Sequence, residues 1–357
     1  MTKNILISAT RQWNPGDEFI MFGVENVIKD MIGSFNPILY NRSPEVRNGR
    51  KYNQYFKTKN KALRIEKMHL LRLFKGGFRD NSFKNGTDES IIDCVVFAGS
   101  PEWYGYRVKS LYEIVKRRKL PCAFLGIGMG DSRDFNKLEK LYYEVLDKAD
   151  VISTRDHQTL EYVSKYGAKY VTCPAFLSAP YNKKVEKVQK VALIYATNKT
   201  VFGNNVSKET HDYLIGLYKE LAKIYNVTLV CHYIDEIEEA RKELPEFDIR
   251  YSYDAKDYID IYNEFDMVVG GRVHGIGICG SLGIPGVMIS HDVRSETVRG
   301  FKAEVINYKE DASYENAIKI IRKVENEIEE RSKILIEHKE NVKKEYIELL
   351  RPMLERI

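Results

Sequence analysis

The sequence predicts an α/β protein made of two Rossmann-like, doubly wound units and a C-terminal helical segment. Short apolar runs alternate with amphipathic segments along most of the 357 residues, which is typical of strands separated by helices. The alternation breaks at residues 174–190, where two prolines and several lysines predict a linker, and then starts again. The stretch 313–357 instead mixes Glu and Lys in a nearly continuous helical pattern.

The first unit is expected to contain a parallel sheet covered by helices on both faces. Apolar runs bounded by polar or turn residues predict strands at 4–8, 37–40, 93–98, 122–126, 151–153 and 170–172. Apolar residues with a helical period predict helices at 18–31, 106–118, 136–146 and 158–166. Strands that alternate with helices in this way pair in parallel.

The same pattern in the second unit predicts a second parallel sheet. Its strands are expected at 191–196, 228–232, 248–251, 267–270 and 286–290, and its helices at 208–224, 234–243, 255–265 and 274–282. One long helix or two consecutive helices should follow and pack across both units, with the charged residues on a solvated face. We therefore divide the chain into domains at 1–178 and 189–310, with C-terminal helices at 311–357.

Positive charge is concentrated in one part of the first domain. Residues 41–90 hold 13 Lys/Arg against 5 Asp/Glu, whereas the whole chain has a net charge of only +5. This basic insertion contains one amphipathic stretch, at 63–74, between loop-forming segments. It is either a lid or acceptor-binding element over the cleft, or a surface loop with a helix. The small total charge gives no reason to expect a nucleic-acid partner.

The cysteines and the apolar runs predict a cytoplasmic protein without a metal. All five cysteines stand singly, mostly in or beside apolar strands, and none forms a CxxC or a Cys/His pair with zinc spacing. Such thiols are typical of reduced core positions in the cytosol. The first residues are expected to form a strand and not a signal peptide, and no apolar run reaches the ~20 residues of a membrane span. Any membrane association would be peripheral.

A candidate anion site follows the predicted strand at 267–270, in the sequence VVGGRVHGIGICG. Two glycines lead into a helix, and free backbone N–H groups at a helix start bind anions. Arg272 adds a planar fork of donors that suits phosphate or carboxylate, and Gly271 lets the chain approach a ligand closely. His274 can exchange a proton near neutral pH. The combination predicts a site for a small anion.

Two further corners place polar residues where a predicted strand runs into a helix. Arg155 follows the strand at 151–153, and Asp156 beside it is suited to cap the next helix. Asn14 and Asp17 follow the first strand. In an open parallel sheet such positions face the crevice outside the carboxyl ends of the strands, so these side chains should line a ligand site.

At these corners the sequence resembles the polysaccharide pyruvyl transferase family. The motifs are N-x-G-D-E at 14–18, S-T-R-D at 153–156, and G-R-V-H-G at 271–275 followed by S-L-G-I-P, and they cover nearly the whole chain in order. The resemblance implies two Rossmann-like domains similar to the GT-B architecture. It also implies transfer of the pyruvyl group of phosphoenolpyruvate to two hydroxyls of a sugar, with formation of a cyclic ketal and release of phosphate. No metal or other cofactor is implied.

The resemblance also implies roles for single residues. Arg155 and Arg272 would hold the phosphate and carboxylate of the donor, and His274 would be the catalytic acid and base. Apart from the resemblance, the chemistry of a carboxylate suits Asp17 to bind or activate an acceptor hydroxyl. The remaining residues expected to bind substrate are Asn14, Gly271 and Arg294. The acceptor would be a sugar, a nucleotide sugar or a sugar-lipid precursor of a cell-surface polysaccharide.

Three departures from the family's pattern concern the acceptor and the reaction. The glycine-rich turn of the first domain is FAGSPEWYG here, where Trp103 is either a platform for a sugar face or a packed aromatic. Cys173 stands before Pro174 in place of the family's aspartate, and Arg294 stands in place of a lysine. Two alternatives therefore remain. One is a metal-independent GT-B glycosyltransferase that uses a nucleotide sugar, and the other is a non-catalytic protein that binds an anionic glycan or nucleic acid through residues 41–90.

Overall fold

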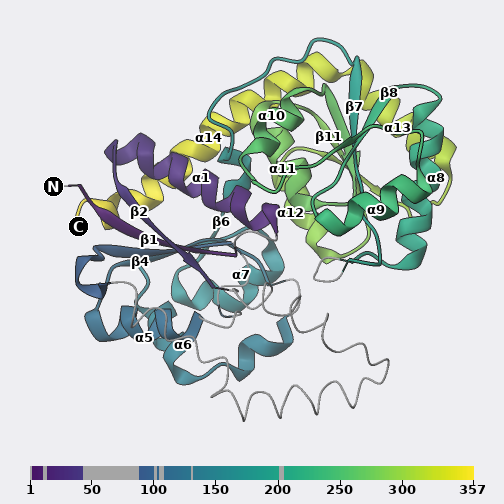
Figure 1. The fold of residues 1–357 in the computed structure, drawn as a ribbon. Helices are drawn as coiled ribbons and strands as arrows, with labels where there is room; N and C mark the ends of the chain where they lie inside the picture. The colour runs from purple at the N-terminus through teal and green to yellow at the C-terminus, as the bar shows by residue number, and fades with distance from the viewer. Residues whose placement is uncertain are drawn as a thin grey trace, which may run out of the picture.

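The protein has two lobes, each built on a six-stranded parallel sheet (Figure 1). The structure is a computed structural model that describes residues 2–10, 14–42, 88–99, 103, 108–129, 132–200 and 205–357. Most of the basic insertion, including the amphipathic stretch predicted at 63–74, lies outside the described residues. The prediction of two doubly wound Rossmann-like units with a helical C-terminus is confirmed.

The first sheet has the strand order β2-β1-β3-β4-β5-β6, with every pair parallel. Its strands are β1 (Asn4–Ala9), β2 (Asn36–Asn41), β3 (Cys94–Ala98), β4 (Cys122–Ile127), β5 (Val151–Thr154) and β6 (Lys169–Tyr170). Its helices are α1 (Pro15–Ile32), α5 (Val108–Arg118), α6 (Lys140–Asp147) and α7 (His157–Val163), with 3₁₀ turns η1 (Glu89–Ile91), η2 (Ser132–Lys137) and η3 (Ser164–Tyr166). The strand order reverses between β1 and β3, and a ligand crevice is expected outside that point.

The second sheet has the order β12-β11-β10-β7-β8-β9, which reverses between β7 and β10. Its strands are β7 (Lys190–Ile194), β8 (Asn226–Val230), β9 (Ile249–Arg250), β10 (Met267–Gly270), β11 (Gly286–Ser290) and β12 (Glu304–Asn307). The helices are α8 (Lys208–Ala222), α9 (Ile234–Glu243), α10 (Asp257–Asn263), α11 (Val273–Leu282) and α12 (Glu296–Gly300), with the turn η5 (Val293–Ser295). Neither β12 nor α12 was predicted, because both are short and carry few apolar residues.

The C-terminal stretch forms two consecutive helices, α13 (Tyr314–Asn326) and α14 (Ile328–Leu354). Helix α14 contacts α11 in the second lobe and α1 and β5 in the first. In Figure 1 it runs from the second lobe back to the end of the first lobe where the chain begins. The Tyr346 hydroxyl, near its end, donates to the Thr172 carbonyl at 2.9 Å. The helix therefore joins elements of both lobes.

The stretch expected to be a linker begins with a buried 3₁₀ turn, η4 (Pro174–Leu177), which packs between α1 and α11. Helix α1 approaches it so closely that a methyl group on Gly23 would lie 1.7 Å from the Pro174 carbonyl oxygen. On the other side, a methyl group on Gly280 of α11 would lie 2.7 Å from the ring of Phe176. One apolar core consequently runs through α1, η4 and α11 from the first sheet to the second, and a second core lies under α5 and α6.

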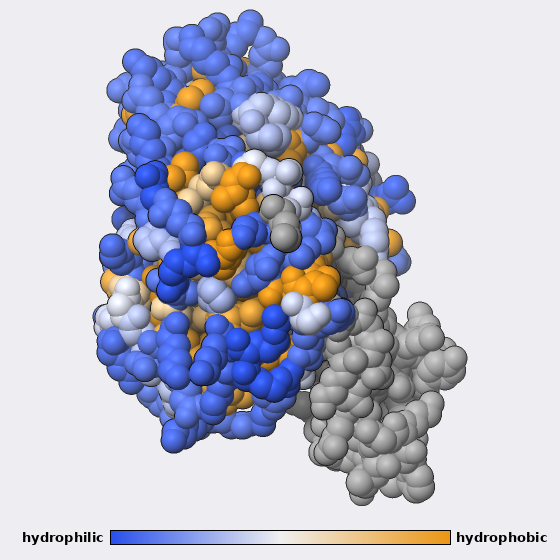
Figure 2. All heavy atoms as spheres, turned by 90° about the vertical axis from the view of Figure 1, so that its left-hand side faces the viewer, coloured by the Kyte–Doolittle hydropathy of each residue, from blue (hydrophilic) through white to orange (hydrophobic). Residues whose placement is uncertain are grey.

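The face that carries both chain ends is mostly hydrophilic, with apolar residues exposed mainly across its middle (Figure 2).

None of the helices in the described part of the chain is long and apolar enough to cross a membrane. All five cysteines are free and buried, as the apolar surroundings predicted.

Candidate active site

The carboxyl ends of the two sheets meet where Arg155 contacts His274. Arg155 directly follows β5 and is 5% exposed, and its backbone N–H donates to the Ile127 carbonyl at 3.1 Å. His274 is the second residue of α11, which follows β10. The guanidinium Nη1 lies 3.1 Å from the imidazole Nε2. Two corners predicted separately from the sequence thus form one site between the lobes.

The contact with Arg155 determines the protonation state of His274. A guanidinium only donates hydrogen bonds, so Nε2 must accept, and the ring proton sits on Nδ1 of a neutral imidazole. Burial lowers the pKa of His274 well below its usual value, and the charges of Arg155 and Arg294 lower it further. With these neighbours the imidazole is therefore a base, not an acid.

The start of α1 forms the wall on the other side of this imidazole. Asn14 caps the helix, and its side-chain oxygen accepts from the Gly16 N–H at 3.1 Å. A methyl group on Gly16 would lie 2.6 Å from Nδ1 of His274, so only glycine leaves room for the ring. The Tyr233 hydroxyl, from the second lobe, reaches the Asn14 side-chain oxygen at 3.4 Å. The first motif of the sequence thus packs directly against the third.

Asp17 lies in the first turn of α1 and is 8% exposed. Its carboxylate is 3.8 Å from the guanidinium of Arg42, which follows β2 and is 2% exposed. Burial raises the pKa of Asp17, although the charges of Arg42 and Arg155 oppose the shift. A carboxyl group with a raised pKa beside a crevice is suited to exchange protons with a hydroxyl.

The structure holds Arg272 in a buried ion pair. Its Nη2 binds the carboxylate of Glu236, which is completely buried, and its Nε donates to the Tyr195 carbonyl at 3.2 Å. The ring of Tyr233 covers the guanidinium, with its centroid 4.6 Å away. Glu236 also accepts from the backbone N–H groups of His232 and Tyr233. Arg272 is therefore fixed at the point where the second sheet reverses its strand order, with part of its donor set already bound.

The other two predicted substrate-binding residues lie on the same side of the second lobe. The Gly271 carbonyl accepts from His291 Nε2 at 3.0 Å. Arg294 binds the carboxylate of Asp292 through Nε at 2.9 Å and Nη2 at 2.5 Å. Its charge still acts on His274. The substrate-binding roles of Arg272, Gly271 and Arg294 stay predictions.

The sequence analysis missed Arg42, Glu236 and Tyr233. Arg42 directly follows an apolar strand, just as Arg155 does, and this shared position could have singled it out. It was overlooked because it begins the basic stretch, where one arginine is not distinctive. Glu236 sits in a run of acidic residues that is typical of a solvated helix face. Tyr233 carries no signal in the sequence.

Trp103 and Asp156 have structural roles in this fold. Trp103 is 4% exposed, and its ring meets that of Phe135 edge-on at 4.9 Å, so it is a packed aromatic. The Asp156 carboxylate accepts from the Thr159 N–H at 2.7 Å and caps α7, as predicted.

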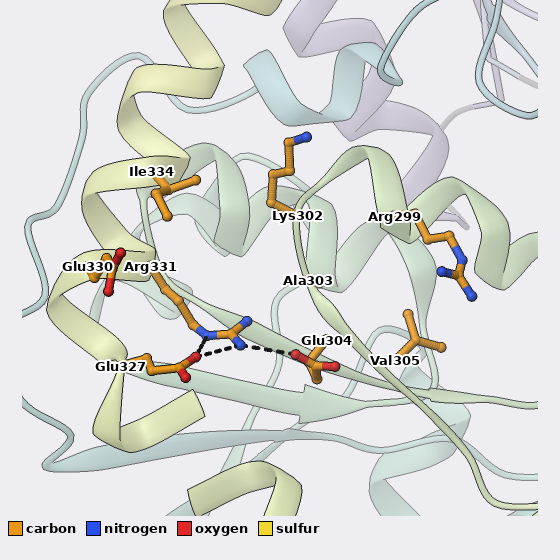
Figure 3. Close-up of a pocket in the computed structure, with 9 residues that line it drawn as sticks. All are labelled: Arg299, Lys302, Ala303, Glu304, Val305, Glu327, Glu330, Arg331 and Ile334. Carbon is orange, nitrogen blue, oxygen red and sulfur yellow. Dashed lines mark hydrogen bonds and ion pairs between the residues drawn. The ribbon is translucent and has the colours of Figure 1, made fainter. Parts of the chain in front are cut away.

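A cavity of about 600 Å³ lies away from these corners, between α12, β12 and α14 (Figure 3). Its wall is charged, but Arg331 binds Glu304 at 3.0 Å and Glu327 at 2.8 Å within the cavity itself. Across the described ranges of the chain, no group of three or more His, Cys, Asp or Glu could hold a metal ion. The expectation of catalysis without a metal stays a prediction.

Residues 14–293 match the family model described as polysaccharide pyruvyl transferase, which covers most of the chain. The protein belongs to this family. It is therefore a transferase, as the motifs predicted. None of the curated proteins matches the sequence.

Solved structures with the same fold include UDP-GlcNAc 2-epimerases. The enzyme from Neisseria meningitidis, bound to UDP-GlcNAc, is 10% identical, with a TM-score of 0.55 and coverage of 99% of this chain and 100% of that chain. A putative UDP-N-acetylglucosamine 2-epimerase from Listeria monocytogenes is 13% identical, with a TM-score of 0.53 and coverage of 94% and 91%. MnaA of S. aureus with UDP is 13% identical, with a TM-score of 0.52 and coverage of 95% and 96%. At these identities the likeness shows the GT-B-type fold alone.

Proposed function

We propose that this transferase moves the pyruvyl group of phosphoenolpyruvate onto two hydroxyls of a polysaccharide or sugar-lipid precursor, forming a ketal and releasing phosphate. The observation that carries the proposal is the 3.1 Å contact between Arg155 and His274 across the junction of the two sheets. It places a fixed cation and a proton-exchanging ring at the start of α11, where backbone N–H groups add to an anion site.

Phosphoenolpyruvate suits this site because it is a compact polyanion. Arg155 would take its phosphate or carboxylate, and Arg272 would take the other group. His274 would pass a proton to the methylene carbon, which makes the adjacent carbon electrophilic for a sugar hydroxyl. Asp17 would receive the proton of that hydroxyl, since its raised pKa favours proton uptake.

The acceptor is a sugar or a nucleotide sugar in this proposal. The family name points to a polysaccharide precursor. Two neighbours of the same fold carry UDP or UDP-GlcNAc, which supports a test of nucleotide sugars as acceptors.

The test is phosphate release from phosphoenolpyruvate with a panel of sugar and nucleotide-sugar acceptors, together with thermal shift. Wild type should be stabilised by the donor and release phosphate only when an acceptor is present. His274→Ala should keep the stabilisation and lose about 10²–10⁴-fold in rate. His157→Ala, which changes an exposed histidine, is the matched control and should behave as wild type. Stabilisation by a nucleotide sugar but not by phosphoenolpyruvate would instead support a glycosyltransferase.

A further inference from the structure

The thiol of Cys173 lies against the contact between Arg155 and His274. Its Sγ is 4.0 Å from the imidazole Nε2, and it also hydrogen-bonds with Arg155. The residue is completely buried at the N-terminal end of η4, where its carbonyl accepts from the Phe176 N–H at 3.0 Å. Burial raises the pKa of the Cys173 thiol, although Arg155 opposes the shift, so the thiol is neutral. A small uncharged group therefore occupies the position beside Nε2.

No acidic partner balances a proton on His274 in the described site. The charged and titratable groups that act on or contact the ring are Arg155 after β5, Arg294 on η5, His232 after β8 and Cys173 before η4. Asp17 stands next to Gly16 at the start of α1, which packs against the ring. Arg155, Arg294 and His232 all disfavour an imidazolium. Asp17 is engaged with Arg42. These side chains thus favour a neutral ring.

We propose that Cys173 is a positioning residue for His274. Its neutral thiol leaves Nε2 of the imidazole to the Arg155 guanidinium, so that His274 is neutral before the anionic donor binds and takes up a proton only when it binds. The part of this inference that concerns donor binding rests on the proposed function. The part that concerns the neutral ring rests on the geometry alone. A carboxylate at residue 173 would instead raise the pKa of the ring and favour an imidazolium even before the donor binds.

A neutral His274 that gains a proton on donor binding fits the proton balance of the proposed reaction. The phosphate or carboxylate of the donor takes the N–H of Arg155, which frees Nε2, and the negative charge of the donor favours an imidazolium. A proton from solvent then binds Nε2. It passes to the methylene carbon as the electron pair of the double bond forms the new C–H bond. One acceptor hydroxyl adds to the neighbouring carbon and loses its own proton, which balances the proton taken up. The C–O bond to phosphate then breaks as the second hydroxyl bonds to the same carbon, and the proton of that hydroxyl goes to the leaving phosphate.

The part that concerns the neutral ring is tested by NMR of ¹⁵N-histidine in the donor-free full chain, with His274→Gln to assign the signal. Wild type and Cys173→Ser should both show a neutral ring, with the proton on Nδ1, from pH 6 to pH 8. Cys173→Asp should show a protonated ring at pH 6. A protonated ring in wild type at pH 7 would overturn the inference. So would a folded Cys173→Asp variant whose His274 titrates at the same pH as in wild type. The serine variant preserves size and neutrality, so the test stands even where the buried aspartate prevents folding.

The part that concerns donor binding is tested by calorimetry of phosphoenolpyruvate binding at pH 7.5 in two buffers with different ionisation enthalpies. At this pH the phosphate, whose second pKa is about 6, is almost fully ionised. Wild type and Cys173→Ser should take up about one proton more per donor than His274→Gln. Equal uptake in wild type and His274→Gln would overturn the inference. Absence of any binding heat would refute the proposed donor and leave the NMR result to decide the role of Cys173.

Discussion

The ammonium of Lys339 should contribute more to stability than any other lysine on α14. It is 8% exposed and donates to four oxygens, three of them at 2.8 Å and one at 3.2 Å. These oxygens are the carbonyls of Ala179, Tyr181 and Ser281 and the side chain of Asn182. The ammonium thereby ties the segment after η4 and the end of α11 to α14.

Lys339→Met keeps the packing of the stem and removes the three N–H donors. Each buried oxygen that loses its hydrogen-bond donor costs about 1–3 kcal/mol. Part of this loss is offset, because the variant no longer has a buried ammonium to desolvate. We expect the free energy of unfolding to fall by about 2–4 kcal/mol, and Tm to fall by about 1–2 °C for each kcal/mol in a chain of 357 residues. Urea unfolding and thermal melts at pH 7 measure both.

Lys343→Met is the matched control, because this lysine lies one turn further along α14. Its side chain is 33% exposed and pairs with Asp30 at 3.3 Å and Glu340 at 3.2 Å, and surface pairs of this kind contribute about 0–1 kcal/mol. Equal losses for the two variants would refute the assignment of a special role to Lys339.

Three further predictions concern the site. Gly16→Ala should lower the catalytic rate about 100-fold, because its methyl group displaces the His274 ring. The free energy of unfolding should change by less than about 2 kcal/mol, and a wild-type rate would contradict the prediction. Glu236→Ala should cost about 3–5 kcal/mol in urea unfolding, because it leaves the Arg272 guanidinium buried without its counterion, and a loss below about 1 kcal/mol would rule out that role. Trp103→Ala should cost about 3–5 kcal/mol and leave the affinity for phosphoenolpyruvate, measured by calorimetry, unchanged; weaker donor binding would place this ring at the site after all.

The sequence was informative wherever structure depends on local patterns. Apolar runs and helical periods located both sheets and the C-terminal helices, and the position of Arg155 and His274 at strand ends placed them at the crevice. The strand β12 was missed because its residues, EVIN, follow a charged turn and contain only two apolar side chains. Its strand character comes from pairing with β11, which is a tertiary contact.

The site depends more heavily on contacts that are distant in the sequence. Arg272 stood out as a candidate, but its counterion Glu236 lies 36 positions earlier and belongs to another helix. The 3.1 Å distance between Arg155 and His274 spans 119 positions and depends on how the two sheets face each other. Residue types at strand ends therefore predict which side chains reach a crevice, but not how those side chains are paired within it.

The two passages of the chain between the lobes have a mechanical consequence. The polypeptide passes from the first lobe to the second at η4 and returns along α14, and both passages pack against α1 and α11. A lobe tethered at a single point can swing and twist in any direction, whereas two neighbouring tethers leave mainly one degree of freedom, a rotation about the line that joins them. Arg155 follows β5 of the first lobe and His274 lies in α11 of the second, so a rotation of one lobe against the other would change the gap between them. The angle between the lobes and the distance between these two side chains would thus change together.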